Sequence, residues 1–177
     1  YDSGQSPPYF ENALTVTPQG NSNGSNSTFG TTLTIRQDNT GVSANGNEYF
    51  SLEHDPIQQK NLLVYRRSNS AGHLGGRGRV LTVSGTTVTA GAESSEFNSN
   101  SIAAISLVYN TASQNFAVGY EDQTTSDGKA VTATISGTSV SFSSELTLDS
   151  TAYGNSQGAY DPDTDNVFFF YKRANND

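Results

Sequence analysis

The segment YDPDTDNVFFFY, residues 160–171, carries three aspartates at alternate positions and then an apolar run that ends in tyrosine. Such aspartates suggest a calcium loop, a catalytic cluster or a tight turn that feeds a strand. Two other segments of the same length align with it, HDPIQQKNLLVY at 54–65 and YNTASQNFAVGY at 109–120. Each copy is typical of a strand, a six-residue turn and a second strand. This repeated hairpin is the unit from which the fold is predicted.

The alignment favours a turn at Asp161, Asp163 and Asp165 over a metal site. Ile57 and Gln59 occupy the last two positions in the first copy, so the hairpin does not need carboxylates there. Asp and Asn favour turns because their side chains bind their own backbone. An alternating acidic run offers hard oxygen ligands to Ca²⁺, but the glycine and the distal Glu of a helical calcium loop are missing. We interpret the segment as a generic turn, keep calcium as the alternative, and assign no metal, cofactor-binding or catalytic residue.

The hairpin belongs to a repeat of about fifty residues. After its closing tyrosine comes a polar loop and then VLTVSGTTV at 80–88 or TATISGTSVSF at 132–142, in which Ser-Gly-Thr separates two alternating strands. Each unit therefore has four strands. Near the start of the chain, residues 29–35 overlay residues 142–148. The predicted division is a half-unit with the third and fourth strands (11–47), two whole units (48–102 and 103–154) and a half-unit with the first and second strands (155–177).

The strand segments are short, rich in β-branched and aromatic residues, and bounded by Gly, Asn, Ser and Asp, without helical periodicity. We predict an all-β protein of four-stranded antiparallel sheets in a β-propeller-like array, with a β-trefoil or β-prism as the alternative. A half-unit at each end leaves unpaired edge groups and an uncovered apolar face. The ends are expected to find each other in a three-unit ring within one chain, a six-unit ring of two chains, or an open filament. Three blades are few for a propeller, which favours completion by another copy or by further chain.

The chain has 17 acidic and 9 basic residues, a formal net charge of −8, and no cysteine. It therefore forms no disulfide and offers no thiolate nucleophile or cysteine-ligated metal site. An acidic surface repels phosphate backbones and anionic lipids, so neither nucleic acid nor a membrane is expected as a partner. No apolar run approaches the length of a bilayer span. The opening YDSGQSPPYF does not begin with Met, which is expected for a processed protein or for a segment of a longer one.

Catalytic patterns are scarce. His54 stands where the other hairpins have tyrosine, and it forms no metal-spaced pair with His73, the second histidine. No G-x-S-x-G motif marks a nucleophilic serine. RQDNTGVS at 36–43 faintly resembles the turn of sialidases, but the chain has no Trp, and no tyrosine-glutamate nucleophile pair can be assigned. The sequence favours a protein that is not an enzyme and leaves a glycan-degrading enzyme as the second alternative.

Four arginines gather in the first whole unit: Arg66, Arg67, Arg77 and Arg79. HLGGRGR at 73–79 lacks the Lys-Ser/Thr ending of a phosphate loop and precedes no helix, so we interpret it as a hairpin loop. Where the first copy has arginine at the strand end, the second has Glu121-Asp122 and the third has Lys172-Arg173. Such alternation suits salt bridges between units or subunits. The functional alternative is a site for acidic sugars, because the arginine fork matches carboxylates.

The segments AYDPDTDNVFFFYKR at 159–173 and KAVTATISGTSVSFSSELTLDSTAY at 129–153 together resemble a repeat of marine, cyanophage-type phage virion proteins and related bacterial surface proteins. The resemblance covers about residues 48–177, and 11–35 more weakly. Its first copy departs from the pattern with a longer, more basic loop at 66–80.

The resemblance implies a propeller-like structural protein of a virion, such as a tail fibre, or of an extracellular surface. Its expected partners are copies of itself or other virion or surface proteins. A carbohydrate-binding or host-adhesion module, with a glycan as ligand, is the first alternative. No cofactor is expected.

Overall fold

The computed structural model of the chain describes residues 9–13, 16–17, 28–38, 49–68, 74–151 and 153–173. Within these ranges every regular element is a β-strand and every strand pairing is antiparallel, which confirms the prediction of an all-β protein. The described residues include no helix able to cross a membrane. The described strands close into no barrel and no propeller ring, so the propeller-like array and its trefoil and prism alternatives stay predictions.

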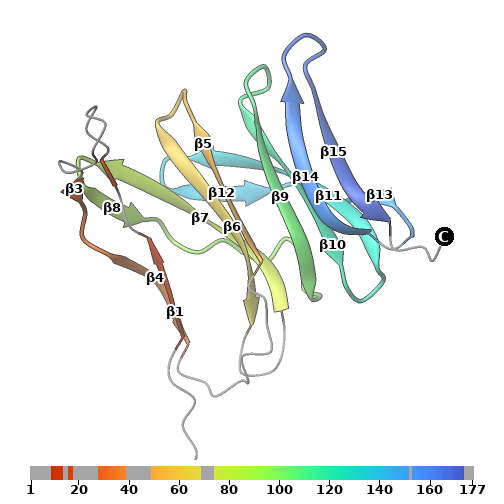
Figure 1. Cartoon of the computed structure of the whole chain (residues 1–177), viewed down its shortest axis with the longest axis horizontal. Coiled ribbons are helices and arrows are strands. Elements are labelled where there is room, and N and C mark those ends of the chain that lie inside the picture. Colours follow the sequence, from red (N-terminus) through yellow and green to blue (C-terminus); the bar gives the residue numbers. More distant parts are fainter. Residues whose placement is uncertain are drawn as a thin grey trace, which may run out of the picture.

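Two central sheets occupy the middle of the chain (Figure 1). Sheet I contains, in chain order, β5 (Phe50–Asp55), β6 (Lys60–Ser68), β7 (Leu74–Ser84) and β8 (Thr87–Ala90). Sheet II contains β9 (Ile102–Asn110), β10 (Asn115–Asp122), β11 (Asp127–Ser136) and β12 (Ser139–Phe142), and β13 (Leu146–Asp149) pairs with the first half of β11. Gly85 and Gly137 take φ of 59° and 62° in the predicted Ser-Gly-Thr turns, where a positive φ lets two residues reverse the chain.

Shorter pairings stand at the two ends of this row of sheets (Figure 1). The N-terminal strands are β1 (Tyr9–Ala13), which pairs with β4 (Leu33–Asp38), and β2 (Val16–Thr17), which pairs with β3 (Thr28–Phe29). The C-terminal hairpin is β14 (Tyr153–Asp161) with β15 (Asn166–Arg173). Each of these sheets has two strands, whereas the central sheets have four and five.

The main core lies between the facing sides of sheets I and II. Sheet I contributes Leu62, Val64 and Val80, all fully buried. Sheet II contributes a larger apolar face: Ile102, Leu107, Tyr109, Phe116, Val118, Tyr120, Val131, Ala133 and Ile135. A second, smaller cluster joins β4 to the other side of sheet I through Ile35, Leu81 and Val88. Neighbouring sheets therefore pack face to face, and each covers one face of the next.

The C-terminal hairpin repeats the pairing of β9 with β10 at a distance of 51 residues. Phe116 faces Tyr109 in sheet II, and Val167 faces Tyr160 in the hairpin. Both pairings also shift register at the same place, where Ala104 and its counterpart Asn155 have φ of 49° and 42°. A bulge residue in this conformation is unusual for a side chain other than Gly, so its recurrence indicates one backbone design used twice.

The N-terminal strands repeat the pairing of β11 with β12 and β13. The matched pairs are Val16–Phe29 with Ala133–Phe142, Ala13–Leu33 with Ala130–Leu146, and Glu11–Arg36 with Gly128–Asp149. A register shift falls between Glu11 and Asn12 in one case and between Gly128 and Lys129 in the other, again at matching positions. The N-terminal strands thus have the pairing of a third and fourth strand, and the C-terminal hairpin that of a first and second. The boundaries of the units at 11–47, 48–102, 103–154 and 155–177 stay a prediction.

Candidate functional site

The aspartates of the opening segment lie in a turn that all three hairpins share. The backbone N–H of Asp163 donates to Asp161 Oδ1 over 3.0 Å. Ile57 N–H donates to Asp55 Oδ1 over 2.9 Å, and Ala112 N–H donates to Asn110 Oδ1 over 2.9 Å. The residue that begins each turn therefore closes it with its own side chain.

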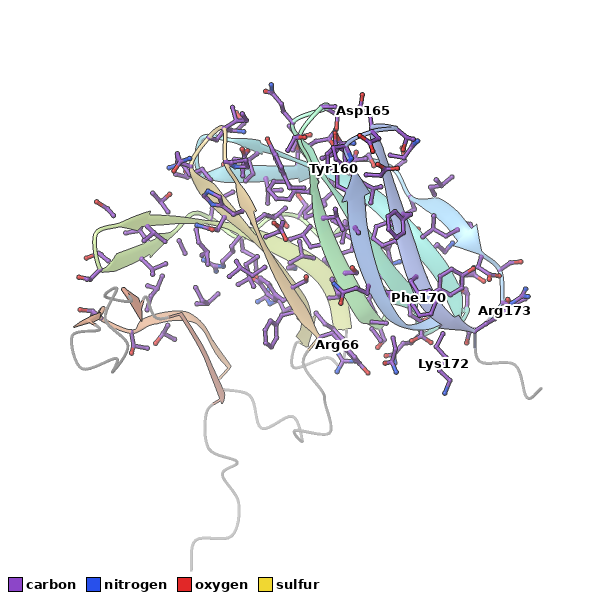
Figure 2. The ribbon with its side chains drawn as sticks, turned by 45° about the horizontal axis from the view of Figure 1, so that its top comes forward. Arg66, Tyr160, Asp165, Phe170, Lys172 and Arg173 are labelled. Carbon is purple, nitrogen blue, oxygen red and sulfur yellow. The ribbon has the colours of Figure 1, made fainter. Side chains whose placement is uncertain are left out.

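Asp165 occupies the turn position where the chain takes a left-handed conformation, with φ of 56°. The matching residues Gln59 and Gln114 both have φ of 54°. Asp165 also accepts a hydrogen bond from the Tyr160 hydroxyl at 2.9 Å, and both residues lie at the tip of the hairpin in Figure 2. Within the ranges that the structure describes, no three His, Asp or Glu side chains gather into a metal site.

The arginines of the first unit are held by neighbouring groups. Arg67 Nη1 lies 2.8 Å from Glu93 Oε2, and Arg77 Nη2 lies 2.9 Å from Glu96 Oε1. Arg79 donates to a backbone carbonyl over 3.1 Å. The fourth, Arg66, is buried, and its guanidinium lies 5.0 Å from the ring centre of Tyr49. The carboxylates of Glu93 and Glu96, on the loop after β8, therefore already pair with Arg67 and Arg77. His54 is a strand-end residue with Nδ1 3.1 Å from Asn61 Oδ1, while His73 lies outside the described residues.

A tyrosine and a glutamate pair in the same place in both central sheets. The hydroxyl of Tyr65 donates to Glu93 over 2.6 Å, and that of Tyr120 donates to Glu145. Burial, and then the glutamate, raise the pKa of both hydroxyls far above the ordinary tyrosine value. Burial also raises the pKa of Tyr109 to about 12. These groups stay protonated at neutral pH, which suits structural hydrogen bonds and not nucleophilic chemistry.

The C-terminal hairpin makes a comparable bond with a different acid. Tyr171 donates to Asp149 Oδ2 over 2.7 Å, and Arg173 Nε lies 3.5 Å from the same oxygen. Hydrogen bonds from Thr151 and then Tyr171 lower the pKa of Asp149 to about 2. This carboxylate ties the end of β15 to β13.

A hollow between the two central sheets is lined by residues 94–97 and 140–143. Glu96 is its ionisable lining residue, and that carboxylate already binds Arg77. The other polar lining groups are serines without a histidine partner. This hollow has no acid-base pair that could act on a substrate.

The outer side of β15 is the most exposed apolar surface of the described chain. Phe170 is 78% exposed and Phe168 is 56% exposed. Phe169, between them, points inward. Its ring packs so closely on Gly119 and Gly158 that a Cβ on either glycine would lie within 3.0 Å of it. In Figure 2, Phe170 and Lys172 mark the lower part of this strand. The second edge of β15 has no strand beside it among the described residues.

A matching apolar surface lies at the other end of the row of sheets. On β5, Phe50 is 70% exposed and Leu52 is 54% exposed. Leu52 faces Leu63 in the sheet pairing, and Leu63 packs against the cluster that contains Ile35 of β4. Phe50 and Leu52 therefore lie on the side of sheet I that the N-terminal strands cover only in part.

Sequence reasoning singled out the VFFFY strand but not this second surface or the tyrosine-glutamate pairs. The alternation in Phe50-Ser-Leu52-Glu already contained a signal for a one-sided apolar strand, and in the two whole units the strand-ending tyrosine has a glutamate after the fourth strand.

No family model, no curated protein and no solved structure matches the chain.

Proposed function

We propose that this chain is a structural assembly module, not an enzyme, and that copies of it complete one another by exchanging half-units. One observation carries the proposal: among the described strands β15 ends the row of sheets with no partner at its second edge, and Phe168 and Phe170 on it are exposed. Unpaired backbone groups on an edge strand are a template for pairing with another chain. An apolar patch beside them favours association over solvation.

The N-terminal end of the chain contains strands of the kind that this edge is missing. The N-terminal strands have the pairing register of third and fourth strands, and the C-terminal hairpin has that of first and second strands. The C-terminal hairpin of one chain and the N-terminal strands of another would together make a sheet like the central ones. A ring of two chains or an open filament would result, according to the rotation between copies.

A virion or another extracellular surface structure is the setting that we propose for this assembly. The resemblance of the repeat to cyanophage-type virion and bacterial surface proteins supports this setting. The intramolecular contacts of the arginines give no particular support to a glycan site.

The test is the mass of the chain in solution. We expect light scattering and sedimentation velocity to give multiples of 18.8 kDa that persist in high salt, since apolar contacts and backbone pairing are weakly screened. A folded monomer at all micromolar concentrations would contradict the proposal. A positive glycan array or turnover of a polysaccharide, in the absence of oligomers, would instead favour adhesion or glycan degradation.

A further inference from the structure

Both central sheets join their second and third strands in one register, which serves as a template. In sheet II, Phe116 faces Ala133 and Glu121 faces Gly128. In sheet I the corresponding residues of β6 and β7 face each other in the same order, with Asn61 opposite Leu81 and Arg66 opposite Gly76. The junction is therefore fixed by the repeat and not by one local sequence.

We propose that β15 of one chain pairs antiparallel with β1 and the start of β2 of a second copy, in the register of β10 with β11. This inference rests on the proposed assembly and specifies its junction. β15 corresponds to β10, and β1 with β2 corresponds to β11. The register places Val167 opposite Val16, Phe170 opposite Ala13, and Lys172 opposite Glu11.

The last pair distinguishes this junction from the two internal ones. In the central sheets the third-strand residue at that position is Gly76 or Gly128, so no charge faces the second strand. At the exchanged junction a lysine stands opposite a glutamate. Opposite charges that face each other across an antiparallel pair are favourable and help to select a register.

The exposed faces follow from the same template. Leu62 and Val64 are the sheet I residues that match Phe168 and Phe170, and sheet II buries them in a cluster that includes Leu107. Leu107 of β9 corresponds in turn to Leu52 of β5. Phe168 and Phe170 of one chain are therefore positioned to pack against the β5 face of the second copy, where Phe50 and Leu52 are exposed.

Two more exposed apolar side chains fit the same arrangement. Leu146 and Leu148 on β13 are 64% and 38% exposed. Their counterparts in the N-terminal strands, Leu33 and Ile35, are covered by β7 and β8 of sheet I. The strands that would cover Leu146 and Leu148 in the same way are the ones that the second copy supplies.

One exchanged position differs from its counterparts in the central sheets. The glutamate that binds the tyrosine in sheets I and II is replaced by Thr32 in the N-terminal strands. Tyr171, the tyrosine of the hairpin, is instead bonded to Asp149 of its own chain. The substitution therefore leaves this hydroxyl satisfied and does not oppose the pairing.

A second copy, and not the same chain, is the partner. β1 and β15 lie at opposite ends of the row of sheets, with sheets I and II between them (Figure 1). The two ends of one chain do not meet, whereas a neighbouring copy can present its N-terminal strands to β15.

The absence of cysteine makes a disulfide test clean. A Glu11→Cys chain and a Lys172→Cys chain, carrying different tags, are co-expressed and mildly oxidised. We expect a heterodimer in which peptide mapping finds the disulfide between positions 11 and 172. Each variant alone should give no such link. As a matched control, Ala13→Cys with Lys172→Cys places the thiols one pair further along the same face, where crosslinking should be at least about tenfold slower because disulfide geometry tolerates little displacement.

The outcomes separate the register from the assembly itself. Oligomers that form without the link between positions 11 and 172, or that link position 13 better, overturn the register and leave the proposed assembly standing. A monomeric, folded wild-type chain overturns both. Crosslinking within a single chain, seen as a monomeric disulfide in the Glu11→Cys/Lys172→Cys double variant and no heterodimer between single variants, overturns the choice of a second copy.

Discussion

Replacing Phe170 with Ala should weaken assembly and leave the fold of the single chain unchanged. Phe170 is 78% exposed, so its ring contributes little to folding, and we expect the free energy of unfolding to change by less than about 0.5 kcal/mol. Full burial of a phenylalanine is worth roughly 1.5–3 kcal/mol, of which the exposed share leaves about 2 kcal/mol for association. At 1.4 kcal/mol per factor of ten, each junction should weaken about 30-fold.

Sedimentation equilibrium measures the association constant, and urea unfolding measures stability on the same samples. Two variants frame the result. Phe169→Ala removes the neighbouring ring that packs inward against the Gly119 and Gly158 positions, and should cost roughly 2–3 kcal/mol of folding stability, less than a fully buried Phe. Ile57→Ala removes a side chain that is 61% exposed on a turn, and should change neither quantity. Unchanged association in Phe170→Ala, or a weakening no greater than in Ile57→Ala, would refute the role of this surface.

Three further perturbations test the proposed junction and the packing of the C-terminal hairpin on sheet II. The charge reversals Glu11→Lys and Lys172→Glu should each weaken association several-fold at low salt, and the double reversal should restore it. If the two losses add in the double variant, positions 11 and 172 do not face each other. Gly158→Ala should destabilise the hairpin by about 1–3 kcal/mol, because the new Cβ would overlap a methyl group of Val108 on β9. Gly154→Ala should be tolerated, because its Cβ would meet a single carbonyl oxygen at 3.8 Å, and equal unfolding midpoints of the two variants would contradict the close approach at Gly158. The pKa of Asp149 is lowered to about 2 in the folded chain, so the stabilisation from its hydrogen bonds is complete above the ordinary aspartate pKa and is lost as the pH falls toward 2. Circular dichroism of the tyrosines should report this loss. If an Asp149→Asn chain gives the same acid titration, the Asp149 carboxylate is not the group that titrates.

The turns of the three hairpins can be predicted from local sequence. Asp55, Asn110 and Asp161 each begin a turn by binding its backbone, as expected from residue chemistry alone. That chemistry depends on atoms within a few positions of each other, so a repeat alignment predicts it. The calcium alternative at Asp161 comes from the alternating acidic run, because such a run and an Asp-rich turn look alike in sequence.

The sites required more than local sequence. Arg67 and Arg77 suggested an anion site by their proximity in sequence, but their partners Glu93 and Glu96 lie on a loop that only sheet pairing brings beside them. In the same way, the exposure of Phe50 could not be deduced from its strand, because the matching position in sheet II is covered by a neighbouring sheet.

Alternating apolar residues, β-branched residues and turn-forming side chains act over a few positions, so the strand content and the turns can be predicted from local sequence. Whether an apolar face is buried or exposed depends on which sheet lies beside it, so the local sequence does not predict it. Phe168 and Leu62 occupy equivalent strand positions, yet Leu62 is covered by a neighbouring sheet and Phe168 lies at the end of the row.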